Sequence, residues 1–405
     1  MINKKLAVLS VVCGVLAMMF IALALHGMSC RNAMSSGDLL VPPGPEALGD
    51  SPKDLQRTVR LGLERLEKED FDQSRCGGKG SGLERCVSDY ILVAVNKEAE
   101  QTLVYVYQGS RSEPPDYTVA LEPGWQRTRV GINVPFAITH PPGQTVVALL
   151  TAIKVDGQVR EMVYAPYSSS LDTPEMRTAG LRYLESLYDQ AASELDTNGV
   201  KSMYIDGPAT ETGDKTHVVS LILTEQVFSD TRFVDGDDKA RLDMVNRTLI
   251  LFAANGPNAY PISRSRVGAV GIAQIMPTTY ANLASAYPSA LLPQDSDEGR
   301  VVHGNAVKAM ILHADNQWWA LQSNKTYISW LKDHPEDKSF VFAAGYNASM
   351  STVRDAIYSC KANWLDESCK KLPSETRRYI TKYRWIRSLL TEASFRHDVE
   401  KNAGH

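Results

Sequence analysis

An acidic residue lies on the apolar stripe of a short predicted helix, and this placement constrains how the chain can fold. The segment 217–228 has helical periodicity, and Glu225 shares one face with four apolar side chains. A carboxylate on a buried face is costly unless it is paired, hydrogen-bonded or protonated. Glu225 is therefore either a general acid in a cleft or a side chain that reaches solvent or meets an arginine. The four apolar residues are Val218, Leu221, Ile222 and Phe228.

A glycine-rich run at 265–277 follows this helix, and two further motifs lie downstream. The run reads Ser-Arg-Val-Gly-Ala-Val-Gly-Ile-Ala-Gln-Ile-Met-Pro, 345–348 reads Gly-Tyr-Asn-Ala, and 375–379 reads Glu-Thr-Arg-Arg-Tyr. Together with Glu225-Gln-Val-Phe, these ordered motifs resemble the catalytic domain of soluble-type lytic transglycosylases over about residues 200–390. The resemblance implies a mainly helical, lysozyme-like fold. Ala273 stands where that family commonly has Met.

The spacing between the acid and the motif serine departs from the family pattern. In the family the glutamate lies much closer to the serine, and a count back from Ser265 without a gap reaches Gly256, which carries no acid. Either the chain has lost its acid, or an insertion separates Glu225 from the loop. We expect a helical insertion at 231–258, because that segment has its own apolar stripe. The stripe consists of Leu242, Val245, Leu249, Phe252 and Ala253.

The resemblance implies cleavage of the MurNAc-GlcNAc β-1,4 bond of peptidoglycan with a single glutamate. Glu225 would first act as acid and then as base on the sugar's C6 hydroxyl, which gives 1,6-anhydromuramoyl ends. Ser265 would hydrogen-bond the substrate or Glu225, or else cap its own loop. Glu375 would bond inside the cleft, or else pair with Arg377 or Arg378. No cofactor and no metal are expected. The residues expected to bind substrate are Ser265, Gly268, Gln274, Met276, Tyr346, Asn347, Glu375 and Tyr379.

Four aspartates follow Glu225 closely and leave a second chemistry open. One of them could serve as a second carboxylate and direct the enzyme toward hydrolysis, as in a lysozyme-type hydrolase. The alternative is a solvated loop. A further alternative to an enzyme is a catalytically inactive peptidoglycan-binding or structural component of a cell-envelope machine. The aspartates are Asp230, Asp235, Asp237 and Asp238.

The first residues predict a membrane anchor. Lys4 and Lys5 precede the apolar run Leu6–Leu25, and about twenty helical residues span the core of a bilayer. The lysines indicate a cytosolic N-terminus, with the rest of the chain in the periplasm. We therefore expect a single-pass protein of the inner membrane with residues 1–30 as its anchor. A cleaved signal peptide and a lipoprotein that uses Cys30 are the alternatives.

Cysteine spacing agrees with export. Cys76 and Cys86 flank one short loop, and Cys360 and Cys369 flank another. Close pairs in an exported chain predict two local disulfides. Zinc binding is the alternative, but no His or Cys cluster with ligand spacing lies near either pair.

Composition changes along the chain predict an α+β multidomain protein. After the anchor we expect a linker and a helix at 31–75, a small β-rich accessory domain at 76–168, and a mainly α lysozyme-like domain at 169–395. Asp172 is expected to cap the first helix of the last domain. The β-rich domain could dock an envelope protein, and no basic patch suggests nucleic acid. The expected strands are 90–95, 102–107, 117–121 and 145–153.

Overall fold

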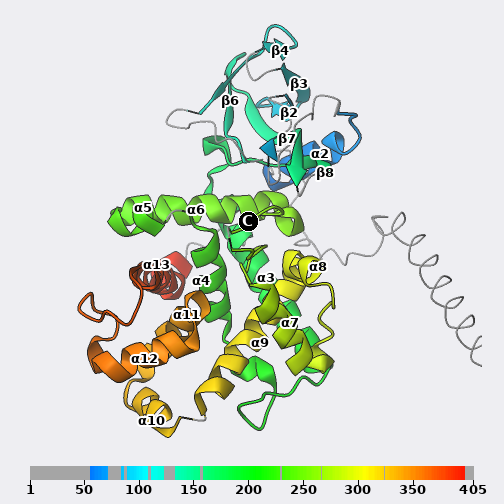
Figure 1. Cartoon of the computed structure of the whole chain (residues 1–405). Coiled ribbons are helices and arrows are strands. Elements are labelled where there is room, and N and C mark those ends of the chain that lie inside the picture. Colours follow the sequence, from blue (N-terminus) through cyan, green and yellow to red (C-terminus); the bar gives the residue numbers. More distant parts are fainter. Residues whose placement is uncertain are drawn as a thin grey trace, which may run out of the picture. The chain divides into compact units, whose positions relative to one another are not determined.

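The computed structural model describes residues 55–71, 84–85, 89–107, 111–122, 133–155, 158–228, 230–265, 267–322 and 324–396. They form one compact unit, in which one helix and the strands precede a series of helices (Figure 1). The strands are β1 (Glu84–Arg85), β2 (Tyr90–Val95), β3 (Gln101–Tyr107), β4 (Arg111–Glu113), β5 (Thr118–Leu121), β6 (Phe136–His140), β7 (Thr145–Val155) and β8 (Gln158–Tyr164). The earlier helices are α2 (Leu55–Leu66), α3 (Pro174–Thr197), α4 (Lys215–Gln226), α5 (Asp230–Asp235), α6 (Asp238–Asn255) and α7 (Pro277–Ala286). The later helices are α8 (Ser296–Val301), α9 (His303–Gln322), α10 (Lys325–Asp333), α11 (Lys338–Asn347), α12 (Met350–Cys360) and α13 (Ser374–Thr391).

The long strand β7 organises an antiparallel sheet. It pairs with β2 from Thr145 to Leu150, with β1 at Ile153 and Lys154, and with β8 along its second half. Strand β3 continues the sheet from β2 to β4, whereas β5 and β6 form a separate pair. The strands expected at 90–95, 102–107, 117–121 and 145–153 are confirmed as β2, β3, β5 and β7.

The hydrophobic core around the sheet includes residues of one helix that precedes the strands in the chain and of one that follows them. Every residue of β2 is buried, as in a strand covered on both faces. Helix α2 contributes Val59 and Leu66 to the same hydrophobic cluster, and a Cβ on Gly62 would lie only 2.9 Å from Val147 Cγ2. Helix α6 contributes Ile250 and Leu251.

Helix α6 also packs against the other helices. Its residues Val245, Leu249 and Phe252 belong to the helical core, so the second half of α6 is buried nearly all round. A Cβ on Gly180 of α3 would lie 1.9 Å from the carbonyl oxygen of Leu249. Glycine at this position therefore permits the close approach of α3 and α6.

The predicted fold class is wrong. No helix of the described residues is long and apolar enough to cross a membrane, and the run Leu6–Leu25 lies outside them. The sheet also does not complete a core of its own within 76–168, because α2 and α6 supply part of it. What the structure describes is a mixed helix-and-sheet unit. The apolar stripe in the sequence of α6 predicted one buried face, whereas the helix buries two faces.

The start of α3 differs from the prediction in its capping residue. Thr173, rather than Asp172, is the N-cap, and its hydroxyl accepts a hydrogen bond from the Met176 amide at 3.3 Å. The Asp172 carboxylate instead pairs with Arg177 and accepts a hydrogen bond from the Tyr167 hydroxyl at 3.1 Å. Asp172 and Thr173, which both precede Pro174, are both residue types that cap helices. The sequence therefore left the position of the N-cap ambiguous by one residue.

Candidate active site

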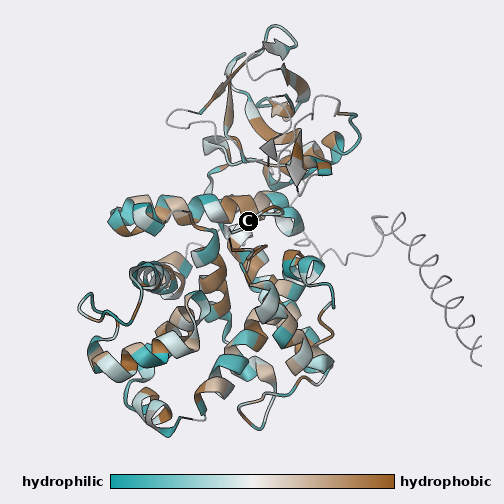
Figure 2. Cartoon of the chain, in the orientation of Figure 1, coloured by the Kyte–Doolittle hydropathy of each residue, from teal (hydrophilic) through white to brown (hydrophobic). Residues whose placement is uncertain are grey.

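Helix α4 carries Glu225 close to its C-terminal end. The Asp214 side chain caps the helix by accepting a hydrogen bond from the His217 amide at 2.8 Å. The middle of α4 is buried, and part of its ribbon has the brown colour of hydrophobic residues in Figure 2. The helix ends at Gln226, so the chain has turned away by Phe228, which is 92% exposed. The prediction that Phe228 continues the apolar stripe is wrong.

Protein atoms surround the Glu225 carboxyl, although part of the residue remains accessible to solvent. The Tyr379 hydroxyl of α13 donates a hydrogen bond to Oε1 of Glu225 at 2.6 Å. Burial raises the pKa of Glu225 to about 7, whereas this hydrogen bond and the positive charge of Lys382 lower it. The negative charge of Asp230 acts in the same direction as burial. Glu225 therefore has a pKa suited to proton transfer in either direction near neutral pH.

Lys382 is a buried cation beside this carboxyl. Its ammonium donates a hydrogen bond to the Val227 carbonyl at 3.0 Å and forms an ion pair with Asp230. It thereby satisfies a backbone acceptor at the C-terminus of α4, where a cation also interacts well with the helix dipole. Sequence reasoning missed Lys382. Its only signal was its position three residues after the motif tyrosine Tyr379, in a domain expected to be mainly helical.

The glycine-rich loop is fastened to the end of α4 by Gln226. The Gln226 amide nitrogen donates to the carbonyls of Gly271 and Ile272 at 3.1 and 2.9 Å. Its amide oxygen accepts a hydrogen bond from the Ser263 hydroxyl at 3.3 Å. Gln274, a predicted site residue, points back into the loop and donates to the Ser263 hydroxyl at 3.0 Å. These bonds bring the loop and the Glu225 helix together despite forty residues of separation between Glu225 and Ser265.

Ser265 closes a turn inside the loop. Its hydroxyl accepts a hydrogen bond from the Ala269 amide at 3.0 Å, and its own amide donates to the Ala269 carbonyl at 2.8 Å. The structure therefore gives Ser265 the loop-capping contacts. Gly268 and Gly271 have φ angles of +93° and +74°, in the region that favours glycine.

Arg300 also supports the loop through hydrogen bonds. Its guanidinium donates to the carbonyls of Gly268 and Ile275 at 2.8 and 3.0 Å, and the residue is 2% exposed. The backbone of Arg300 also approaches Gly271 closely, because a Cβ there would lie 2.2 Å from the Arg300 carbonyl oxygen. Gly271 thus has two reasons to be glycine, whereas Gly268 has only its φ angle.

Tyr346 at the end of α11 contacts the same loop. Its hydroxyl donates to the Ala273 carbonyl at 2.5 Å, and the negative charge of Glu225 adds to burial in raising the pKa of Tyr346. The His313 ring of α9 lies edge-on to Tyr346, with 5.2 Å between ring centroids. Asn347 is partly buried at the last position of α11, and Met276 is partly buried where α7 begins.

Glu375 does not join the other predicted site residues. It is exposed in the first turn of α13, one turn before Tyr379. The alternative, an ion pair with Arg377 or Arg378, is not found among the described residues either, and the Arg377 guanidinium donates to the carbonyls of Cys369 and Leu372 at 3.0 and 2.5 Å. A glutamate in the first turn of a helix is favourable through the helix dipole alone. The sequence motif could not distinguish that contribution from a place in the site.

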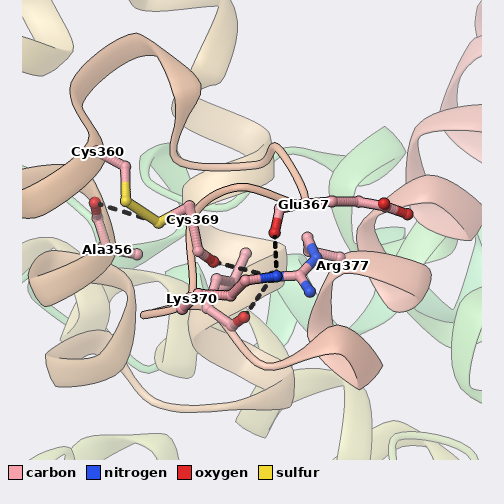
Figure 3. Close-up of a disulfide and its surroundings, with 7 residues drawn as sticks. Ala356, Cys360, Glu367, Cys369, Lys370 and Arg377 are labelled. Carbon is pink, nitrogen blue, oxygen red and sulfur yellow. Dashed lines mark hydrogen bonds between the residues drawn. A yellow bond between two sulfur atoms is a disulfide. The ribbon is translucent and has the colours of Figure 1, made fainter.

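A disulfide holds the segment that leads into α13. Cys360 and Cys369 are bonded, with 5.8 Å between their Cα atoms, and this prediction is confirmed (Figure 3). The Arg377 guanidinium donates a hydrogen bond to the Cys369 carbonyl at 3.0 Å (Figure 3). Cys76 and Cys86 lie outside the described residues, so their pairing stays a prediction.

The aspartates that could supply a second carboxylate mostly have structural contacts. Asp230 pairs with Lys382, and Asp237 caps α6 by accepting a hydrogen bond from the Ala240 amide at 2.8 Å. Asp238 accepts a hydrogen bond from the Trp385 indole at 2.9 Å, and Asp235 is exposed at the end of α5. The segment expected to be a helical insertion forms α5 and α6.

The site is a carboxyl with a raised pKa, a tyrosine that hydrogen-bonds it, and a glycine-rich loop that hydrogen bonds hold beside it. Comparison with protein-family models, with curated proteins and with solved structures found no match. Within the part of the chain that the structure describes, no group of three or more acidic, His or Cys side chains could hold a metal ion.

Proposed function

We propose that this chain is a peptidoglycan lytic transglycosylase in which Glu225 is the single acid and base. The observation that carries the proposal is the Glu225 carboxyl, whose pKa of about 7 lets it exist in both protonation states near neutral pH. The order of the four sequence motifs supports the substrate class, since the resemblance to soluble-type lytic transglycosylases implies peptidoglycan glycan strands.

In the proposed reaction, protonated Glu225 donates its proton to the glycosidic oxygen as the bond from C1 of the muramic residue breaks. The carboxylate then accepts the proton of the C6 hydroxyl, whose oxygen forms the new bond to C1. Atoms balance without water, and Glu225 returns to its protonated state. Tyr379 holds Oε1, and we assign proton transfer to Oε2.

The engagement of the nearby aspartates supports a single-carboxylate mechanism over hydrolysis. A second catalytic carboxylate must face the reacting sugar as nucleophile or activate a water. Asp230, whose charge reaches Glu225, is paired with buried Lys382, and Asp237 accepts a backbone amide. One oxygen of each of these carboxylates therefore already has a partner within the protein, which fixes the side chain in a structural contact.

The test is digestion of purified peptidoglycan by the wild type and by Glu225→Gln. We expect the variant to fold and to release soluble muropeptides at least a thousandfold more slowly, because the amide cannot transfer a proton. Glu367→Gln is the matched control, since Glu367 is exposed in the loop before α13. Wild-type rates from folded Glu225→Gln protein would refute the proposal.

A further inference from the structure

The disulfide loop (residues 360–369) contacts the two helices that carry tyrosines beside Glu225. Cys360 ends α12 and is bonded to Cys369, which is 1% exposed. The Trp364 side chain lies inside the loop and is fully buried. A disulfide that closes so short a loop restricts the conformations that the chain between its ends can adopt.

Trp364 connects the disulfide loop to the start of α11. Its indole N–H donates a hydrogen bond to Oδ2 of Asp337 at 3.3 Å, and Asp337 directly precedes α11. Tyr346 lies near the other end of this helix, where its hydroxyl donates to the Ala273 carbonyl of the glycine-rich loop. The disulfide loop is therefore bonded to the element that presents Tyr346.

Arg377 connects the same loop to the first turn of α13. Its guanidinium donates to the carbonyls of Cys369 and Leu372 at 3.0 and 2.5 Å (Figure 3). Leu372 is 1% exposed, so the guanidinium bonds a buried stretch of chain. Two residues after Arg377, Tyr379 donates its hydrogen bond to Glu225.

The ionisable groups that act on Glu225 come from three helices. They are Tyr379 and Lys382 of α13, Asp230 of α5 and Tyr346 of α11. The guanidinium that bonds the disulfide loop is not one of them. A change at that guanidinium therefore reaches the acid through position rather than through charge.

We propose that the Cys360–Cys369 disulfide and Arg377 are positioning groups for the Glu225 site. The disulfide fixes the loop, and Arg377 carries that constraint to the first turn of α13. The Tyr379 hydroxyl is thereby held against Oε1 of Glu225. The consequence for catalysis rests on the proposed function, whereas the effect on Glu225 can be measured without turnover.

The experiment is an NMR titration of the Glu225 carboxyl in the full chain, with Glu225→Gln to assign the signal. In Arg377→Gln the carboxyl should titrate at a pH higher by about half a unit or more, because a weakened bond from Tyr379 stabilises the carboxylate less. Arg378→Gln is the matched control at the next residue of α13, which is exposed, and should leave the titration unchanged. A titration that is unmoved or lowered in folded Arg377→Gln, or moved equally in Arg378→Gln, overturns the proposal.

The disulfide is tested by the double variant Cys360→Ser, Cys369→Ser. It should move the titration of Glu225 in the same direction as Arg377→Gln does. A folded double variant in which Glu225 titrates as in the wild type would overturn the role of the disulfide.

A last comparison separates positioning from a general loss of stability. In a Tyr379→Phe background the bond to Glu225 is already absent, so Arg377→Gln should cause no further shift. A purely structural role of Arg377 would add the same shift in both backgrounds, and that result would overturn the proposal. If the titrations behave as expected and the wild type releases no muropeptides, the positioning inference stands and the proposed function fails.

Discussion

The Tyr379 hydroxyl donates a 2.6 Å hydrogen bond to Oε1 of Glu225, so α13 and α4 meet at the acid. This bond stabilises the charged carboxylate and opposes the larger effect of burial on its pKa. The balance between the two sets the pH at which Glu225 changes its protonation state.

Replacing Tyr379 with Phe removes that stabilisation. The pKa of Glu225 should then rise above about 7, because only burial and neighbouring charges remain. Activity that requires protonated Glu225 should fall at a higher pH than in the wild type, with a lower maximum rate because the carboxyl is less well oriented. The pH dependence of kcat/KM measures both effects. An alkaline limb that is unmoved, or moved to lower pH, would show that the bond does not control Glu225.

Substitutions of Lys382 and of Asp230 should shift the alkaline limb of the pH profile in opposite directions. Lys382→Met removes a positive charge that lowers the pKa of Glu225, so the limb moves to higher pH. Asp230→Asn removes a negative charge that raises it, so the limb moves to lower pH. Breaking the pair by removing Lys382 should also cost on the order of 3 kcal/mol in the free energy of unfolding.

Asp230→Asn also tests the hydrolytic alternative. We expect it to remain active, because Asp230 pairs with Lys382 rather than serving catalysis. Shifts of the same sign in the two variants, or loss of all activity in folded Asp230→Asn, would contradict the charge arrangement described above.

The two glycines of the loop give a matched pair for stability. Gly271→Ala places a methyl group 2.2 Å from the Arg300 carbonyl oxygen in addition to a strained φ angle, whereas Gly268→Ala has open space and only the strained φ angle. We expect Gly268→Ala to lower the free energy of unfolding by about 1 kcal/mol and Gly271→Ala by clearly more. Urea unfolding of both variants measures the difference, and equal losses would show that the Arg300 contact yields easily.

Buried His303 should make the fold less stable in acid. Its imidazole accepts the Tyr183 hydroxyl at Nδ1 and donates from Nε2 to the Ala259 carbonyl, and burial lowers its pKa from 6.5 to about 4. Between these values the unfolded chain binds more protons, so the free energy of unfolding falls as pH drops from 6.5 to 4. The loss from this residue is on the order of 3 kcal/mol.

Glu225 contributes to the pH dependence of the free energy of unfolding with the opposite sign, because its pKa is raised in the folded state. Its contribution is present below its ordinary pKa and is lost as pH rises through about 7. Urea titrations of the wild type and of His303→Gln from pH 7.5 to 4 separate the contribution of His303 from that of Glu225. An identical pH dependence in both proteins would show that His303 is not the group responsible.

The sequence was sufficient for local features that depend on periodicity. The strand at 90–95, the helix that carries Glu225 and the helices of 231–258 follow from apolar spacing, and the structure contains them. It was not sufficient where tertiary packing decides. Phe228 lies on the projected stripe of α4, but the helix ends at Gln226, and no capping glycine marked that end.

The contacts around Glu225 were predicted only in part. Tyr379 and Tyr346 belong to motifs and could be named, whereas Lys382 and Gln226 make polar contacts that no spacing rule indicates. Glu375 shares a motif with Tyr379 but lies one helical turn earlier and faces solvent. Motif membership placed these residues on one segment and did not determine which side chains reach the acid.

The central claim is that one carboxyl performs both proton transfers, and the mass of the product ends tests it most directly. Purified peptidoglycan is digested with the wild type, and the released muropeptides are examined by mass spectrometry before and after borohydride reduction. We expect muramic ends that lack one water relative to reducing ends and that borohydride does not reduce, released at least a thousandfold more slowly by Glu225→Gln. Reducible muramic ends from the wild type would mean hydrolysis and would contradict the single-carboxylate mechanism.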